Sequence, residues 1–410
     1  MEVVPLVKES TREEIGHFYV PRFEIKIEGV GLPRDVLRDV VQVTYKDNIK
    51  EIDSFELTVN NWDAQARTFK YIGSETEKVL KSGSPESLRY KLFEPCGKEV
   101  EVWMGYLDSL KLMLKGHFTT MEPSFPSGGA PTLNVRGLNV LHKLRPHQYT
   151  YAWENERPSS IAKNIATLLD PKTKKKRFPW PIVISDGANN KEEKIHYVSQ
   201  QNLYDIDFLL NLARQYGYVV FVREGNPKAP QPEEREKHIY FGPSNDRVSG
   251  LRKVVYELKW GISLVDFKPT LTTANQIKSV TVNGWDRKAK KAIKQTVTVD
   301  DTDIRKVNAD LHRFLCEARE EHVVDEPIFT KKQAHKRAEA LLLDRLKEIV
   351  KASGTCVGLP DIRAGQLVRI EGVGSRLSGT YFVTDSMHTM NDSGYITKFN
   401  ARREVEVAQK

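Results

Sequence analysis

The sequence predicts an α+β fold, mostly β, in which two related antiparallel β-barrels flank a small α+β domain. Three observations predict it. Short stretches that alternate apolar and polar residues fill both ends of the chain. Apolar residues at helical spacing occur mainly in the middle and once near the C-terminal end. The two strand-rich ends also resemble each other. A chain of 410 residues is long enough for two to four domains.

Composition and charge limit the class of protein. Hydrophobic residues make up 39% and charged residues 29%, a balance typical of globular proteins. The formal net charge of +8 is a mild excess for this length, so it permits an acidic partner without requiring one. The N-terminus has no signal-peptide core, and no apolar run reaches membrane-spanning length. We therefore expect synthesis in the cytoplasm and no direct membrane insertion.

Cysteine usage argues against a disulfide scaffold. Cys96, Cys316 and Cys356 are far apart and odd in number, and no CxxC metal pair exists. The pattern indicates a reducing compartment or indifference to redox conditions. Cys96 lies in the turn EPCGK without a recognisable histidine partner, so we expect it to be structural.

Residues 1–150 are predicted to form the first barrel. Phe23, Ile25 and Ile27 alternate with charged residues, as in a half-buried strand. The same period of two recurs in VQVTY, SFELTVNN, EVEVWMGY, HFTTMEPSF and TLNVRGL, with turn sequences such as GVGLP, PCGK and PSGGAP between strands. Residues 62–92 break this pattern and are predicted to form a partly helical insertion.

Residues 151–265 are predicted to form the small α+β domain. In RPSSIAKNIATLLDP, Pro158 suits the first turn of a helix and Pro171 ends it. In NLYDIDFLLNLARQYG, Asn202 can cap a second helix, which Gly217 ends. The strands YVVFVRE and HIYFGP follow, on either side of a polar, proline-rich segment. The apolar face expected for the first helix consists of Ile161, Ile165, Leu168 and Leu169.

Residues 266–410 are predicted to form the second barrel. QIKSVTVNGWD and AIKQTVTVD should pair as a hairpin around the basic turn RKAKK. A helix is expected near 330–350 with Thr330 as its N-cap, followed by the strands GQLVRIEGVG, GTYFVTDSMHTM and GYITKFNARR. The helix has one apolar stripe, which we expect to pack on the second barrel. It consists of Ala334, Ala338, Leu341, Leu342, Leu346 and Ile349.

The closing strands of the two barrels match in order, spacing and turn placement. VEVWMGY leads to Gly116, then HFTTMEPSF, a glycine turn and TLNVRG; LVRIEGVG leads to Gly379, then TYFVTDSMHTM, a glycine turn and YITKFNAR. A helical segment interrupts both halves before these strands. Chance similarity between two hairpins is the alternative, because hairpins are common; we favour duplication.

On these residues the chain resembles the late control D family of phage tail hub proteins. The same fold forms the T-even phage hub and the N-terminal part of VgrG spikes. Four stretches carry the resemblance in family order, and together they cover most of the chain. They run from GKEVEVWMGY to NVLHKL, over QQNLYDIDFLLNLARQYGY, over FKPTLTTANQIKSVTVNGWDRKAKKAI, and from GLPDIRAGQLVRIE to YITKFNARR.

The resemblance implies a structural role without enzymatic activity. Hubs of this family are homotrimers in which two barrels per subunit form a pseudo-sixfold ring between a sixfold tail tube and a threefold spike. The implied partners are further copies of the chain, a spike protein, an inner tube or tube-initiator protein, and baseplate wedge proteins. The protein would then join the baseplate of a virion or injection-system particle. Because the chain stops about where the second barrel ends, we expect the spike to be a separate protein.

The sequence predicts no catalytic, cofactor-binding or metal-binding residue. Asp385, His388 and Asp392 are the nearest metal-ligand candidates, but Asp385 and His388 are three apart in a predicted strand and should face opposite sides. The glycines of GVGSRLSG, at 372–379, join two strands, so they lack the helical N–H groups of a phosphate loop.

A β-rich, cell-wall-degrading hydrolase is one alternative, because 55 acidic residues could supply a catalytic pair. Adjacent acids such as Glu13 and Glu14, or Glu320 and Glu321, are more typical of solvated surface. No GxSxG nucleophile elbow is present, and no segment is left over to build a cleft domain.

A basic nucleic-acid-binding module is the other alternative. KTKKKR at 172–177 and DRKAKKAIK at 286–294 could contact phosphates, but neither has interleaved aromatic residues for base stacking. We expect solvated loops or contacts to acidic proteins, and no specific nucleic-acid complex. Trp62 and Trp285 fit an interface or a barrel rim equally well and receive no role.

Overall fold

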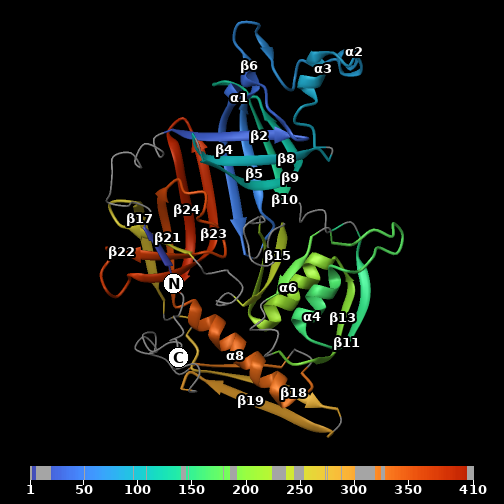
Figure 1. The fold of residues 1–410 in the computed structure, drawn as a ribbon, viewed down its shortest axis with the longest axis vertical. Coiled ribbons are helices and arrows are strands. Elements are labelled where there is room, and N and C mark those ends of the chain that lie inside the picture. Colours follow the sequence, from blue (N-terminus) through green and yellow to red (C-terminus); the bar gives the residue numbers. More distant parts are fainter. Residues whose placement is uncertain are drawn as a thin grey trace.

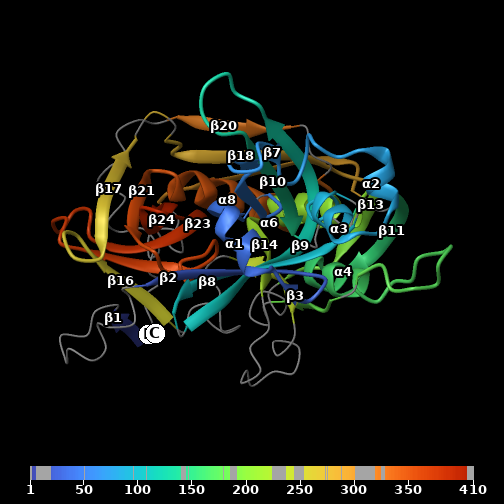
Figure 2. The same cartoon turned by 90° about the horizontal axis from the view of Figure 1, so that it is seen from above.

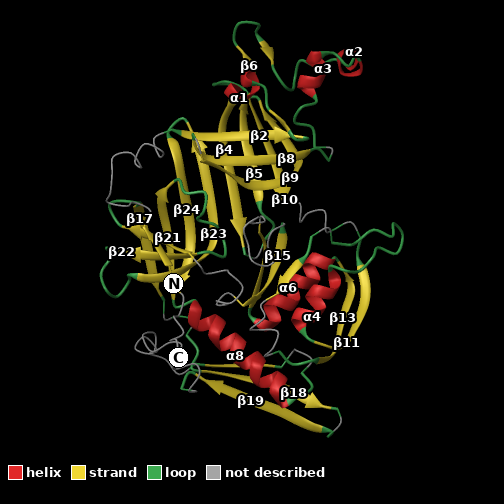
Figure 3. Cartoon of the chain, in the orientation of Figure 1, coloured by secondary structure: helices red, strands yellow, loops and turns green. Residues whose placement is uncertain are grey.

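The computed structural model of the chain describes residues 2–5, 20–49, 51–95, 97–107, 109–139, 145, 147–178, 180–184, 192–223, 237–243, 254–272, 274, 276–287, 289–300, 319–324 and 328–403. Strands dominate this part of the chain (Figure 3). Fourteen of them form one large, mostly antiparallel sheet. The predicted fold class, α+β and mostly β, is confirmed.

The N-terminal barrel is a six-stranded part of the large sheet, in the order β4-β5-β10-β9-β8-β2. All neighbours are antiparallel, and the sheet curls so that β2 and β8 cross in front of β4 and β5 (Figure 1). Its apolar core lies on one face, as the alternation predicted. The strands are β2 (Pro21–Ile27), β4 (Val40–Asn48), β5 (Ser54–Asn60), β8 (Glu99–Tyr106), β9 (Ser109–Ser124) and β10 (Thr132–Asn139). Between β2 and β4 lie β3 (Val30–Gly31) and α1 (Arg34–Asp39).

The segment 62–92, predicted to be a partly helical insertion, lies between β5 and β8 and contains two short helices. It projects from one end of the N-terminal barrel (Figure 1), and none of the residues of its helix α2 is buried. Its elements are β6 (Trp62–Asp63), β7 (Thr68–Phe69), α2 (Glu77–Lys81) and α3 (Pro85–Tyr90).

The middle of the chain forms a small α+β unit around its own apolar core. One pair of strands is antiparallel, and a second sheet has three strands in the order β12-β15-β14. The pair consists of β11 (Tyr149–Glu156) and β13 (Ile195–Leu203), and the three strands are β12 (Ile182–Ile184), β14 (Tyr218–Arg223) and β15 (His238–Pro243). The two helices are α4 (Pro158–Ile165) and α6 (Asp205–Tyr216).

The ends of these helices differ in part from the sequence prediction. Helix α4 begins at Pro158 as predicted but ends before Pro171, because the N–H and the hydroxyl of Thr167 both bond the carbonyl of Asn164 and tighten the last turn. Leu169 is therefore exposed. Asn202 does not cap α6, because it lies in β13, where its N–H donates to Thr150 Oγ1 at 3.2 Å. Gly217, at φ 65°, ends α6 as predicted.

The C-terminal barrel is the other six-stranded part of the large sheet, in the order β17-β21-β24-β23-β22-β16. Its first strand begins before the predicted boundary at 266, and β16 runs parallel to β22, so this barrel is not wholly antiparallel. The strands are β16 (Val254–Lys259), β17 (Leu264–Leu271), β21 (Val350–Val357), β22 (Leu367–Glu371), β23 (Gly379–Asn391) and β24 (Gly394–Arg403). Beyond β16 lies β1 (Glu2–Pro5), parallel to it.

A second layer interrupts the C-terminal barrel between β17 and β21. The predicted hairpin is present as β18 (Ser279–Asp286) and β19 (Lys291–Thr298), and β20 (Glu320–Val323) joins it. Helix α8 (Lys331–Lys347) lies along this small sheet (Figure 3). The expectation that its stripe packs on the barrel is corrected in part: the hairpin leaves the barrel and α8 packs mainly on β18 and β19, while its buried residues share one apolar core with the barrel. The buried residues of the stripe are Ala334, Ala338, Leu342 and Leu346 within α8, and Ile349 just after the helix.

The two barrels have the same strand order, and five of the six strands also run in corresponding directions; the exception is the first strand, because β2 pairs antiparallel with β8 whereas β16 pairs parallel with β22. In chain order, β2, β4, β5, β8, β9 and β10 correspond one by one to β16, β17, β21, β22, β23 and β24, and the order of the strands within each sheet is then identical. The insertions differ by one strand: the N-terminal barrel is interrupted after its third strand and the C-terminal barrel after its second. The internal repeat predicted from the closing strands is confirmed over six strands in their order and over five in their direction.

The repeat extends to local irregularities. Thr119 in β9 and Thr384 in β23 are skipped by the pairing with β10 and β24, as in a β-bulge. The hydroxyl of each donates to a main-chain carbonyl of the partner strand, at 3.4 Å and 3.1 Å. Val41 in β4 and Val265 in β17 are skipped in the same way. Because bulges at two matching positions are improbable by chance, the repeat fixes a residue-by-residue correspondence between the barrels.

Candidate assembly interface

The two barrels are joined side by side within the chain. The second half of β23 pairs with β4 antiparallel, from Asp385 opposite Asn48 to Asn391 opposite Gln42. The first half of β23 pairs on the same side with β22 instead. An eight-stranded sheet therefore runs without a break through both barrels, in the order β17-β21-β24-β23-β4-β5-β10-β9 (Figure 1).

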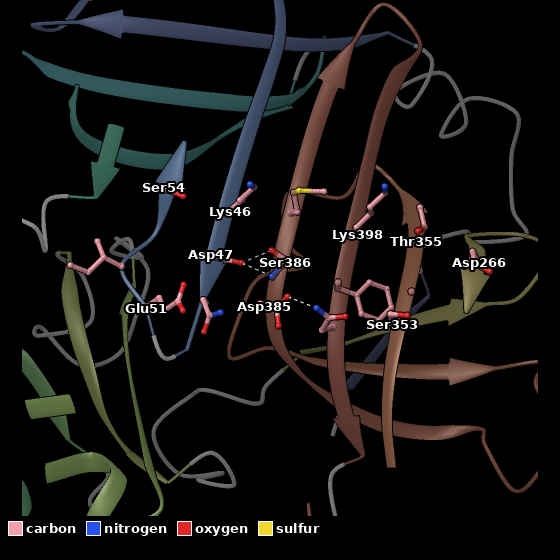
Figure 4. Close-up of a pocket in the computed structure, with 16 residues that line it drawn as sticks. Lys46, Asp47, Glu51, Ser54, Asp266, Ser353, Thr355, Asp385, Ser386 and Lys398 are labelled. Atoms are coloured by element: carbon pink, nitrogen blue, oxygen red, sulfur yellow. Dashed lines mark hydrogen bonds between the residues drawn. The ribbon is translucent and has the colours of Figure 1, made fainter. Parts of the chain in front are cut away.

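One face of this eight-stranded sheet is polar and hollowed. A groove crosses the joint between the barrels, and side chains of β4, β23, β24 and β21 line it together (Figure 4). A second groove continues over β17, β21 and β24. The face carries charges of both signs, and the opposite face holds the apolar cores. Charged residues that line the grooves include Lys46, Glu51, Asp266, Lys268, Asp385 and Lys398.

Asp47 of β4 is the centre of a buried polar cluster at the joint. Its carboxylate accepts from Arg363 Nε at 2.7 Å and from the N–H groups of Ala364 and Ser386, both at 3.1 Å. The Ser386 hydroxyl also donates to it. Arg363 donates further to Tyr45 and to the carbonyl of Met113. The cluster thus links strands of the N-terminal barrel to the loop before β22, and it fixes how the barrels meet.

His388 lies beside this cluster and is fully buried. Its ring nitrogens lie 2.9 Å from the Ile362 carbonyl, 2.9 Å from the Tyr395 hydroxyl and 3.1 Å from Ser386 Oγ. Burial lowers the pKa of His388 to about 4, so the ring is neutral at physiological pH. Ser386 and His388 look like a nucleophile and base by spacing, but both are buried and both are committed to packing contacts.

Asp53 is the second buried acid at the joint. It accepts from Asn139 Nδ2 at 3.0 Å and from the Asn48 N–H at 3.4 Å. Burial, and then the neighbouring charge of Asp47, raise the pKa of Asp53 to about 7. The joint therefore holds an acid with a raised pKa and a histidine with a lowered pKa.

The eight-stranded sheet ends in two open edges. Among the described residues, no strand pairs with 118–124 of β9 on the side away from β10, and β17 pairs with β21 alone as a ladder. The two edges lie at opposite ends of the sheet, and β17 lies at the outer margin of the molecule seen from above (Figures 1 and 2). Each edge carries a proline, Pro123 and Pro269. A sequence rule that assigns proline-containing strands to sheet edges could have found both.

The structure separates the sequence candidates for a metal site. Asp385 and His388 lie on opposite faces of β23, as the alternation predicted: Asp385 is bonded to Asn400 and His388 lies in the core. Asp392 is exposed in the turn after β23. Within the described ranges, no group of three or more histidine, cysteine, aspartate and glutamate side chains could hold a metal ion. The glycines at 372–379 join β22 to β23, as expected.

The remaining candidates are dispersed. Glu320 is exposed and Glu321 pairs with Arg345 at 3.3 Å, while Glu13, Glu14, Cys96 and Cys316 lie outside the described residues. Cys356 is buried in β21, and burial raises the pKa of its thiol to about 12. Trp62 is half-buried against Phe69, and Trp285 is exposed on β18.

The basic run at 172–177 lies in a turn, and the run at 286–294 extends from the end of β18 through the turn into β19. In the run at 172–177, Arg177 is buried, with its guanidinium 3.3 Å from the centre of the Tyr149 ring. In the turn between β18 and β19, Arg287 lies 4.3 Å from the centre of the Phe329 ring. Lys172, Lys174, Lys175 and Lys176 are exposed, as expected of a solvated loop; the Arg177 side chain is buried, and Arg287 is exposed although it contacts Phe329.

Comparison with known proteins identifies the fold. One protein family, described as the Alg8 N-terminal domain, matches residues 19–392. No curated protein matches the sequence. Among solved structures, the 43 kDa tail protein of prophage MuSo2 from Shewanella oneidensis is 15% identical with a TM-score of 0.62, and the alignment covers 93% of this chain and 98% of that one. A tail protein from Neisseria meningitidis MC58 is 14% identical with a TM-score of 0.60, over 94% and 97% of the two chains.

A third similar structure comes from a secretion system. An Escherichia coli component of the type VI secretion system, described as structurally similar to the T4 bacteriophage tail proteins gp27 and gp5, is 11% identical with a TM-score of 0.50, over 94% of this chain and 80% of that one. Identities this low show a shared fold. The resemblance to the phage tail hub fold is confirmed.

Proposed function

The chain belongs to the Alg8 N-terminal domain family, and we propose that it is the structural hub of a phage tail or a phage-like contractile injection system. In this role it is a homotrimeric adaptor that joins a sixfold inner tube to a threefold spike. The observation that carries the proposal is the repeat: one chain presents two barrels with the same strand order, side by side in one sheet.

Symmetry explains why such a repeat suits an adaptor. Three copies of a chain with two equivalent barrels present six similar faces, while the parts outside the repeat occur only three times. The six faces fit a sixfold tube. The middle α+β unit and the layer of α8, β18 and β19 have no counterpart in the other half of the chain, so they keep threefold symmetry and fit the spike side.

The polar, hollowed face of the eight-stranded sheet supports a channel. A ring of such sheets with this face inward gives a lumen lined by mixed charges and hydroxyl groups, with the apolar cores away from water. Mixed charge suits the passage of other molecules, because no single sign of charge retains them. The protein then acts as part of the particle, with the spike, the inner tube or its initiator, and the baseplate wedge as partners.

We further propose that the chain has no enzymatic activity and forms no specific nucleic-acid complex. His388 and Ser386 are committed to the buried joint, and Arg177 is stacked on Tyr149 instead of free for phosphates. In the described part of the chain, none of the helices has the length and apolar character that a membrane crossing requires.

Mass photometry tests the proposed assembly. The purified chain is measured alone and after coexpression with the spike protein of the same particle. A species of three times the chain mass of 46.9 kDa, free or on the spike, supports the proposal. A chain that stays monomeric with its spike partner present contradicts it.

A further inference from the structure

The internal repeat specifies how the two open edges of the sheet can be used. Within the chain, β23 pairs with β4. The repeat makes β9 the counterpart of β23 and β17 the counterpart of β4. In a ring of copies, the pairing of β23 with β4 within one chain is therefore repeated between chains as the pairing of β9 of one copy with β17 of the next.

We infer that β9 and β17 pair antiparallel between copies of the chain, in the register that the bulges dictate. This inference rests on the proposed function, which supplies the ring. Because Thr119 corresponds to Thr384 and Val265 to Val41, the register follows from the pairs within the chain. The resulting pairs are Thr120 with Thr272, Met121 with Leu271, Glu122 with Thr270, Pro123 with Pro269, and Ser124 with Lys268.

The side chains of the two edges are complementary in this register. On the core-facing side Met121 meets Leu271, and Leu271 is 42% exposed in the single chain, an unfavourable place for a large apolar side chain on a sheet edge. On the polar face Glu122 is the diagonal neighbour of Lys268, so opposite charges approach each other. A slip by one residue would place Leu271 opposite a polar-face residue and lose both contacts.

A proline on each open edge limits the number of hydrogen bonds that the edge can form. The N–H of Thr272 donates to the Ile349 carbonyl, toward β21. Main-chain N–H directions alternate along a strand, so the main-chain nitrogen of Pro269 points to the open edge of β17. Pro123 corresponds to His388, which pairs with β4, so the main-chain nitrogen of Pro123 points to the open edge of β9. Each proline therefore removes an edge donor without weakening the sheet of its own chain. In the inferred register the two prolines face each other, so the joint between copies has fewer ladder hydrogen bonds than β23–β4.

Disulfide trapping tests the register in the full chain with its spike partner. The main-chain N–H groups of Glu122 and Thr270 point away from the edge, so these residues form a non-hydrogen-bonded pair with Cα atoms about 4.5 Å apart. That separation suits a disulfide, which needs roughly 4.4–6.8 Å. In a Cys96→Ser, Cys316→Ser background, Glu122→Cys with Thr270→Cys should give linked dimers and trimers on non-reducing gels.

Two controls identify the pairing partner. Glu122→Cys with Lys268→Cys differs by two residues in register and leaves the thiol-bearing residues roughly 7–8 Å apart, too far for efficient linkage. Glu122→Cys alone reports pairing of β9 with another β9. Linkage in either control, without linkage in the Glu122 and Thr270 pair, overturns the inference.

Leu271→Asp gives a second readout that does not depend on thiols. The side chain is already partly exposed, so the variant should melt within about 2 °C of the parent, as expected for a surface change. In mass photometry the variant should not form the trimer expected of the parent, because the new charge lies against Met121 in the joint between copies. The trimer could form without a disulfide between positions 122 and 270 and persist in Leu271→Asp. That result would refute the strand pairing and leave the hub proposal intact. A chain that never forms trimers refutes the hub.

Discussion

The N-terminal and C-terminal barrels share their strand order and two of their bulges, yet the segments that interrupt them differ in kind. The N-terminal insertion projects into solvent, and its helix α2 has no buried residue. The C-terminal insertion is a layer of helix and sheet whose apolar residues belong to the same core as the barrel. The repeat thus tolerates two sites of insertion with different energetic consequences: the N-terminal insertion adds mostly surface and places only a few residues, such as Tyr71, in the core, whereas the C-terminal insertion adds core.

The largest effect expected from this comparison is in the C-terminal insertion. Leu342→Asp places an uncompensated charge at a fully buried position of α8, and we expect a loss of about 4–5 kcal/mol in the free energy of unfolding. Urea denaturation followed by circular dichroism measures it. Leu88→Asp, on the exposed side of α3 in the N-terminal insertion, is the matched control and should change stability by less than about 0.5 kcal/mol. Equal losses in both variants would remove the distinction between the insertions.

The joint between the barrels should be next in sensitivity. Arg363→Met leaves the buried carboxylate of Asp47 without its cation, and the expected cost is on the order of 3 kcal/mol. Lys111→Met breaks an ion pair across the same two barrels, with Asp361, but at the surface, where such pairs contribute about 0–1 kcal/mol. Thermal melts of the two variants compare them directly. A melting temperature for Arg363→Met equal to that of Lys111→Met would show that the cluster does not hold the barrels together.

The two shifted groups at the joint predict opposite responses to pH. Asp53 has a raised pKa, about 7 against 3.8, so its contribution to stability is present below pH 3.8 and is lost as the pH rises toward 7. His388 has a lowered pKa, about 4 against 6.5, so its contribution is present above pH 6.5 and is lost as the pH falls toward 4.

Replacing Asp53 separates these contributions. Asp53→Asn should stabilise the chain at pH 8 by on the order of 2 kcal/mol, and the gain should shrink toward pH 4. The stability of the variant should then fall with acid more steeply than that of the parent between pH 6.5 and 4, because His388 acts alone. Unfolding curves at a series of pH values provide the measurement. If the stability of parent and variant depends on pH in the same way, the pKa of Asp53 is not raised in the folded chain.

The smallest expected difference is between the caps of the inserted helices. Thr330 Oγ1 accepts from the Gln333 N–H at 3.1 Å and caps α8, whereas Thr76 caps α2 at 3.4 Å. Thr330→Ala should cost about 1 kcal/mol. Thr76→Ala should cost only a few tenths, because α2 buries no residue and can fray without loss of core. Chemical denaturation midpoints resolve the difference, and a larger loss for Thr76→Ala would reverse the assignment of core and surface.

The alternating strands, the partly helical insertion and the internal repeat could be predicted from the sequence, because a period of two and glycine turns are local signals. The position of α8 could not, since the stripe through Leu342 fits any apolar surface, and the surface it packs on is formed by β18 and β19 after they leave the barrel. The early end of α4 depends on Thr167, whose hydroxyl competes for a helix carbonyl.

The joint between the two barrels could not be predicted from the sequence either. Asp47 and His388 are separated by most of the chain, and nothing local marks a strand that pairs with two different neighbours. Their burial follows from the pairing of β23 with β4, a non-local contact. The prolines at 123 and 269 were visible, and their meaning as paired edges required the correspondence between the barrels.

The pairing of β23 with β4 also sets an order of events during synthesis. Asn48 has left the ribosome long before Asp385 exists, and at about 5–20 residues per second the interval is roughly twenty seconds to a minute. Throughout that time β4 is an unpaired edge with a buried acid, Asp47, that has not met Arg363. The nascent N-terminal barrel is thus the stage most exposed to wrong strand pairing, and a chaperone that shields β4 would act before the C-terminal barrel closes on it.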